Sequence, residues 1–247
     1  MKLRPLVAAG LLAPLCVIPQ LPASLMGEML ASQCQQRCRL ALSEGSLWAG
    51  QGELYLRAGP NAPWQATGLL HWRGQWQNGL PGLKIKLGGG EIDTLLGSDG
   101  VQIRLHDIAL PANALLSQLG DKFPQTGWQG WISLPQGQLS LNHDGRWHSQ
   151  GEIYWRNART RLLEDAPLGD WQLHWQRPND QALQGQLNTQ GGELTLQGQL
   201  NWPGPGQAMR FDGQANATKG GPLEKYLRAV GVRGGDCGGC YRLHWPK

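Results

Sequence analysis

An alternation of polar and apolar residues runs through most of the chain after Trp48, and it limits the possible folds more than any other feature. Strict alternation is typical of a β-strand with one buried face. Gly, Pro, Asn and Asp residues, which favour turns, separate the alternating stretches. We therefore predict strands at 52–57, 68–76, 82–88, 101–110, 137–142, 151–156, 171–176, 184–190, 192–202 and 241–245.

Two segments depart from this alternation and favour short helices. The first is ANALLSQLG at 112–120, with Pro111 before it and Gly120 at its end. The second is PLEKYLRAVGV at 222–232, with Pro222 in its first turn. Proline near the start and glycine near the end are typical of helices. The sequence thus predicts a mainly β fold, a curved antiparallel sheet with two short helices, as one β-rich domain over 45–247.

The N-terminus predicts export from the cytoplasm. Residues 5–27 carry no charge and follow Lys2 and Arg4. As a helix, this stretch would span about 35 Å, enough for a bilayer core. We interpret 1–4 as cytoplasmic, 5–27 as a single-pass transmembrane anchor and 28–44 as a periplasmic helical linker. The alternative is a cleaved signal peptide, although no A-x-A-like site follows Ile18. Both interpretations place the remainder in the periplasm or beyond.

Cysteine spacing fits an oxidising compartment. Cys34 and Cys38 form a C-x3-C pair, Cys237 and Cys240 a CGGC pair, and Cys16 lies in the apolar segment. An exported chain favours structural disulfides among the four paired cysteines, and their connectivity stays open. Free thiols, or a metal or redox site, are the alternatives.

Catalytic and ligand-binding motifs are absent from the sequence. The six histidines form neither H-x-x-x-H nor H-E-x-x-H, and no G-x-S-x-G or phosphate-binding loop occurs. The net charge is +4 with no basic stripe, so nucleic acid is not an expected partner. We expect no enzyme activity, no catalytic residue, no cofactor and no metal.

Tryptophans allow two interpretations. Six of the 12 are candidates for stacking rings on the sheet, and the pairs Trp72/Trp76 and Trp171/Trp175 would each share a sheet face. Exposed rings would suit a sugar-binding module. With only two Phe in the chain, a role in the core is favoured instead. The six are Trp72, Trp76, Trp128, Trp131, Trp171 and Trp175.

The order of several short motifs resembles type II secretion system protein N. The sharpest is the turn G-[ST]-L-W-x-G, here Gly45-Ser46-Leu47-Trp48-Ala49-Gly50, and the second is W-x-x-A within YWRNA. Others are LPASLMGEML, LHWRGQW, IALPANALL, GWISLPQGQLSL, LGDWQLHW, GELTLQGQLNW and LEKYLRAVGV. Ser46, where threonine is commoner, and the paired cysteines depart from the family pattern.

This resemblance implies a single-pass inner-membrane protein with a periplasmic β-rich domain. It implies an accessory, non-enzymatic role in exporting folded proteins across the outer membrane, with other inner-membrane or secretin components as partners. Gly45 and Gly50 would permit a tight bend, Leu47 belongs to the same motif, and Trp48 would plug the sheet end. The alternatives are an AsmA-like lipid-handling bridge and, less favoured, a secreted carbohydrate-binding module.

Overall fold

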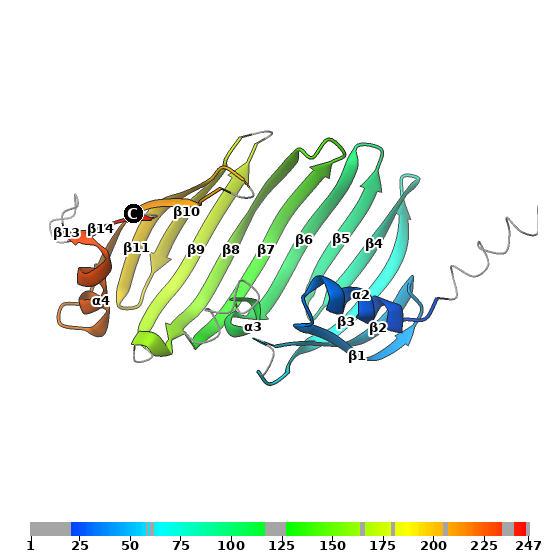
Figure 1. The fold of residues 1–247 in the computed structure, drawn as a ribbon, viewed down its shortest axis with the longest axis horizontal. Helices are drawn as coiled ribbons and strands as arrows, with labels where there is room; N and C mark the ends of the chain where they lie inside the picture. Colours follow the sequence, from blue (N-terminus) through cyan, green and yellow to red (C-terminus); the bar gives the residue numbers. More distant parts are fainter. Residues whose placement is uncertain are drawn as a thin grey trace, which may run out of the picture.

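A computed structural model describes residues 21–57, 59, 62–116, 127–163, 166–178, 181–204, 207–233 and 240–245. These residues form one open antiparallel sheet of 14 strands (Figure 1). The strands are β1 (Cys38–Gly45), β2 (Ala49–Leu56), β3 (Gln65–Gln77), β4 (Leu80–Leu87), β5 (Gly90–Gly97), β6 (Gly100–Pro111), β7 (Trp128–Asn142), β8 (Trp147–Thr160), β9 (Pro167–Arg177), β10 (Leu183–Gln190), β11 (Leu194–Trp202), β12 (Arg210–Ala217), β13 (Val232–Arg233) and β14 (Tyr241–Trp245).

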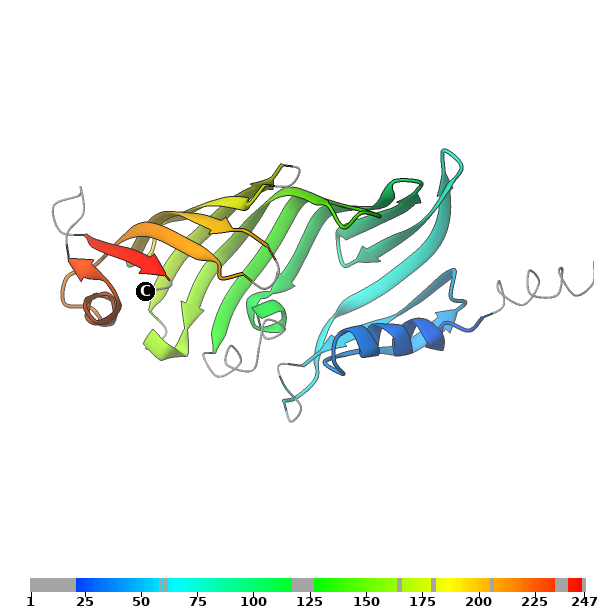
Figure 2. The ribbon, with the colours of Figure 1, turned by 45° about the horizontal axis from the view of Figure 1, so that its top comes forward.

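The sheet is a meander in which each strand from β1 to β12 pairs with its neighbours in sequence. Only the last step differs, because β14 pairs with β12 and then with the two-residue β13 at the edge. The sheet curves along its length and does not close on itself (Figure 2).

Three α-helices among the described residues lie on one face of the sheet (Figures 1 and 2). They are α2 (Ser24–Gln33), α3 (Ala112–Leu116) and α4 (Pro222–Val230), and a 3₁₀ helix follows β8 at Arg161–Leu163. Helix α4 begins with Pro222 after the extended Gly221, and it buries Leu223 and Leu227. The expected helices near 112 and 222 are therefore confirmed, with residues 117–120 outside the described part.

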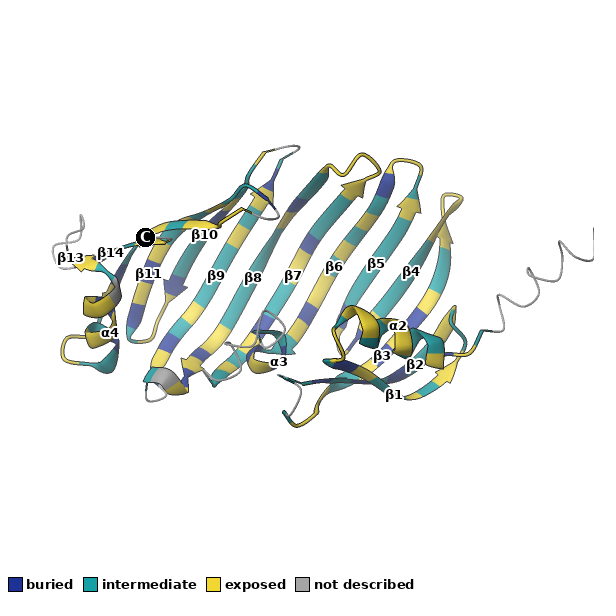
Figure 3. Cartoon of the chain, in the orientation of Figure 1, coloured by how far each residue is buried: buried dark blue, intermediate teal, exposed yellow. Residues whose placement is uncertain are grey.

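Two hydrophobic cores lie under the helices at opposite ends of the sheet. Met26 and Leu30 of α2 pack over one core, which contains Cys38, Leu54, Leu56, Leu70, Trp72, Leu87 and Ala114. The second core unites the buried leucines of α4 with Ala158, Ala166, Leu168, Leu194, Leu196, Ala215 and Tyr241. Along β2 and β11, for example, more buried and more exposed residues alternate, as the period of two predicts (Figure 3).

Each of the ten predicted strand segments overlaps a strand, which confirms the mainly β fold. Four strands were missed, among them the two-residue β13, whose Val232 was expected to end the second helix. The expected helical linker over 28–44 is helical only to Gln33, and Cys38–Gly45 is the edge strand β1. Gly90–Gly97 is β5, and Arg210–Ala217 is β12.

The expected anchor at 5–27 is wrong at its C-terminal boundary. The Leu47 amide donates to the carbonyl of Leu21 at 2.7 Å, and the Ala23 amide donates to that of Gly45 at 3.3 Å. Ala23 is only 3% exposed, because α2 lies directly against the sheet. Residues 21–27 thus belong to the sheet domain, and 1–20 lie outside the described residues. No helix within the described part is long and apolar enough to cross a membrane.

Candidate interaction surfaces

One face of the sheet carries a row of polar side chains that crosses ten consecutive strands. Direct cross-strand neighbours from β3 to β12 make up this polar row: Arg73, Lys84, Asp93, Arg104, Gln138, Gln150, Gln176, Gln184, Asn201 and Arg210. Its middle part, from Gln138 on β7 to Asn201 on β11, is uncharged, and we call these five residues the amide ladder. A carboxamide both donates and accepts hydrogen bonds, so this strip suits a polar, neutral partner.

A shallow hollow of about 320 Å³ lies beside the amide ladder over β6 to β9. Two carboxylate–histidine pairs line this face. Glu152 lies 3.2 Å from Nδ1 of His174, and Asp212 lies 2.5 Å from Nδ1 of His244. Sequence reasoning missed both pairs, because their members are 22 and 32 residues apart and only the strand register brings them together. Within the described part of the chain, no three His, Cys, Asp or Glu side chains gather closely enough to hold a metal ion.

The opposite face is apolar, and glycines make room on it for large side chains. Its central row crosses β3 to β14: Trp72, Ile85, Ile92, Leu105, Gly137, Gly151, Trp175, Gly185, Leu200, Phe211 and Trp245. A Cβ at Gly151 would lie 2.5 Å from the ring of Trp175. A Cβ at Gly198 would lie 2.4 Å from the ring of Phe211. The recurring glycines in the strands thus provide space for side chains of the next strand.

The turn from Gly45 to Gly50 holds the ring of Trp72, and the expectation that Trp48 plugs the sheet end is wrong. Trp72 is 2% exposed, whereas Trp48 is 46% exposed. A Cβ at Gly50 would lie 2.5 Å from the Trp72 ring, so the glycine is required for that packing. Gly45 has φ +95°, and a Cβ there would meet the Ala49 carbonyl at 2.4 Å. Both glycines belong to the tight bend, and Gly50 makes room for the tryptophan of β3.

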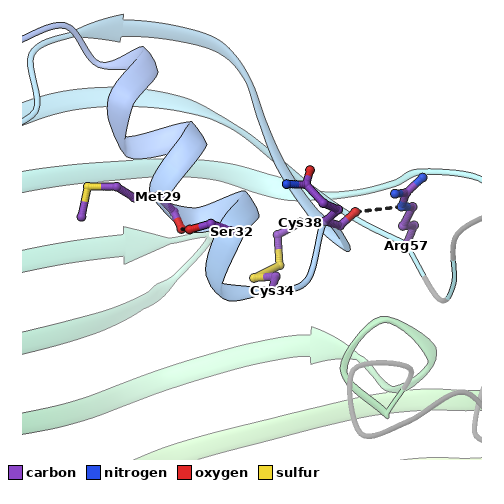
Figure 4. Close-up of a disulfide and its surroundings, with 6 residues drawn as sticks. Met29, Ser32, Cys34, Cys38 and Arg57 are labelled. Atoms are coloured by element: carbon purple, nitrogen blue, oxygen red, sulfur yellow. Dashed lines mark hydrogen bonds between the residues drawn. A yellow bond between two sulfur atoms is a disulfide. The ribbon is translucent and has the colours of Figure 1, made fainter.

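A disulfide joins the end of α2 to the start of β1 (Figure 4). Cys34 and Cys38 are bonded, with 5.6 Å between their Cα atoms. Arg57 steadies the turn between them, since its Nε donates to the Gln36 carbonyl at 2.9 Å. Cys240 is buried and also disulfide-bonded. Cys16 and Cys237 lie outside the described residues, so the expected oxidation of Cys237 stays a prediction.

Tryptophans divide between the core and the surface. Trp128, Trp155 and Trp171 pack against the core near α4, with ring centroids of neighbouring pairs 5.2 Å and 5.6 Å apart. Trp76 and Trp131 are 78% and 56% exposed. They point to opposite faces, since Trp76 shares the face of Trp72 and Trp131 directly precedes the buried Ile132. Two such rings do not form one stacking platform for a sugar.

An open meander with an amide ladder on one face and helix-capped cores on the other is a scaffold that offers binding surfaces. A sequence profile of type II secretion system (T2SS) protein N matches residues 36–243, a range that extends from just before β1 into β14. The chain belongs to this family, as its motifs suggested. Proteins of this family are components of a secretion system. Neither a curated protein nor a solved structure was found to match the chain.

Proposed function

We propose that this protein is an accessory inner-membrane subunit of the type II secretion system that supports export of folded proteins through protein–protein contacts. The observation that carries the proposal is the family match, because it covers nearly the entire sheet. The N-terminal segment, uncharged after Arg4, would hold the protein at the inner membrane, with the sheet domain in the periplasm. Other inner-membrane or secretin components would be its partners.

The amide ladder is the contact surface that best supports this role. Gln150, Gln176 and Gln184 are exposed, and the ladder lies on the face opposite the three helices. The sheet edges are less suitable for adding a partner strand. Edge strand β1 is interrupted by a bulge after Ala41, where Leu42 has φ +50°, and β13 has two residues. Bulged and short edges discourage strand addition.

Site-specific photocross-linking in secreting cells tests the proposal. A photoreactive residue at Gln150 or Gln184 should cross-link to another subunit of the secretion apparatus. The same residue at Lys225, exposed on α4, is the matched control and should not. The double variant Gln150→Arg/Gln184→Arg should stay abundant and lose secretion. Normal secretion by this variant, without cross-links from the ladder, would contradict the proposed contact surface.

A second candidate function, an AsmA-like lipid-handling bridge, is favoured by the apolar face. Between the two cores, Ile92, Leu105, Ile153 and Leu173 are half-buried on this face. The glutamines of the amide ladder lie on the other side of the sheet, so they do not interrupt this apolar face. Mass spectrometry of lipids that copurify with the full chain tests this function. If the function is lipid handling, a Leu105→Glu variant should copurify with less phospholipid than the unsubstituted chain. If the subunit acts through the amide ladder alone, the amount of copurified phospholipid should be the same for both.

A further inference from the structure

We propose that the corner of the sheet formed by the β1–β2 turn and the β3–β4 tip lies on the bilayer surface, with Trp48 and Trp76 in the lipid headgroup region. This docking corner comprises residues 45–52 and 74–83. The proposal rests on the proposed function, because it requires that residues 5–20 anchor the chain in the membrane. It concerns a different part of the molecule from the amide ladder.

The first argument is where the uncharged N-terminal segment meets the fold. Leu21 is bonded directly to the β1–β2 turn through the Leu47 amide, and Pro22 forms a bridge with Ser46. No linker therefore separates residue 20 from the docking corner. The start of α2, the β1–β2 turn and the β3–β4 tip lie at the same end of the molecule (Figures 1 and 2). Whatever surface holds residue 20 also holds this end of the sheet.

The second argument is the position of two exposed indole rings. The Trp48 ring lies over Gly74 of β3, where an added Cβ would be 3.4 Å from its Cε3 atom. Trp76 lies two residues after Gly74 on the same face of β3, about 7 Å further along the strand. The exposed fractions are 46% for Trp48 and 78% for Trp76. Tryptophan prefers the membrane–water interface, where its ring is partly apolar and its N–H reaches water.

The third argument is charge. The docking corner contains no Asp, Glu, Lys or Arg residue in either of its two stretches. The neighbouring tips on the same edge differ, since β5–β6 carries Asp99 and β7–β8 carries Asp144 and Arg146. The charged residues that flank the two stretches, Glu44, Glu53, Arg73 and Lys84, lie within strands and not at the two tips. An uncharged corner with two exposed rings fits the headgroup region better than it fits open solvent.

Spin-label accessibility in vesicles tests the docking. The full chain in a Cys16→Ser background is reconstituted into phosphatidylethanolamine–phosphatidylglycerol vesicles and labelled at Gln77→Cys. The matched control carries the label at Lys219→Cys, in an exposed turn before α4. We expect the ratio of oxygen to nickel-complex accessibility to be several-fold higher at 77 than at 219. Adding Trp76→Asp should return the ratio at 77 to the value at 219.

Each other outcome overturns the docking. Equal ratios at 77 and 219, with the protein still in the vesicles after a carbonate wash, would mean that the corner lies in water. A label at 77 that is shielded from both reagents would indicate contact with a second copy instead. Loss of the protein from vesicles during the wash would refute the anchor, and with it the topology in the proposed function. The wash and the accessibility ratio therefore separate failure of the anchor from failure of the corner.

Discussion

The indole N–H of Trp72 donates a hydrogen bond to the backbone carbonyl of Ser46 at 3.0 Å, and this bond joins β3 to the β1–β2 turn. The pair explains why the turn sequence matters to the fold although Trp48 itself is exposed. Gly50 leaves space for the ring, and the Ser46 carbonyl orients it.

Substitution of Trp72 should destabilise the domain far more than substitution of Trp48. Trp72→Ala should lower the free energy of unfolding by about 3–5 kcal/mol, as for other large truncations in a core. Trp48→Ala should change it by less than about 1 kcal/mol, because the ring is half exposed. Urea unfolding of both variants measures this. Equal losses in the two variants would show that Trp48 belongs to the core.

The contrast between these two tryptophans shows what the sequence could and could not predict. Alternation predicted ten strand segments, because the pattern of polar and apolar residues can be read within each segment of the sequence. It missed β12, whose apolar side is Phe211, Gly213, Ala215 and Ala217, since glycine and alanine give a weak signal. It missed β1 because the bulge near Leu42 interrupts the period. Which tryptophan is buried depends on Gly50 and on α2, so spacing within β3 alone could not decide it.

Adding a methyl group at Gly151 should destabilise the sheet through the ring of Trp175. Its Cβ would lie 2.5 Å from that ring, so Gly151→Ala should cost about 1–3 kcal/mol, as other overpacked sites do. Gly89→Ala is the matched control, because no atom lies within 4 Å of its Cβ position. In a double-mutant cycle, Trp175→Leu should recover part of the loss. A loss unchanged by Trp175→Leu would assign the effect to the backbone instead.

Removing residues 21–23 should weaken the domain even though they precede the first strand. A chain that starts at Ser24 lacks the Leu21 carbonyl and the Ala23 amide, which bond to Leu47 and Gly45. It should be less stable by about 1–3 kcal/mol than a chain that starts at Leu21, from two lost hydrogen bonds and one buried methyl group. Thermal unfolding of the two chains compares them. Identical stability would show that this contact contributes nothing to the sheet.

Peptide mapping without reduction should recover Cys34 linked to Cys38, and Cys237 oxidised. The double variant Cys34→Ser/Cys38→Ser should lose roughly 2 kcal/mol, since the bridge closes a short loop. Cys16→Ser is the control and should leave stability unchanged. Stoichiometric zinc bound by the reduced protein, with four protected thiols, would contradict the assignment to structural disulfides.

Two tyrosines should ionise at unusually high pH. Hydrogen bonds to the carboxylates of Glu53 and Glu152 raise the pKa of Tyr55 and of Tyr154, because ionisation would place two negative charges together. A raised pKa in the folded state contributes stability below pH about 10, which is lost as the pH rises through the folded value. A titration followed by absorbance at alkaline pH should therefore show two tyrosines that ionise at higher pH than an ordinary tyrosine. The double variant Glu53→Gln/Glu152→Gln should lower the pKa of both. An unchanged titration in that double variant would exclude the carboxylates as the cause.

The meander has a consequence for how the chain reaches its native state. Strands β1 to β12 each pair with the strand made just before, so these strand pairings join elements that are neighbours in the sequence. Low contact order favours rapid folding. The sheet can therefore grow strand by strand from β1 as the chain emerges, always presenting one unpaired edge to the next segment. At the far end, β14 pairs with β12 on one side and with the two-residue β13 on the other. The edge formed by β13 therefore offers little backbone to a further strand.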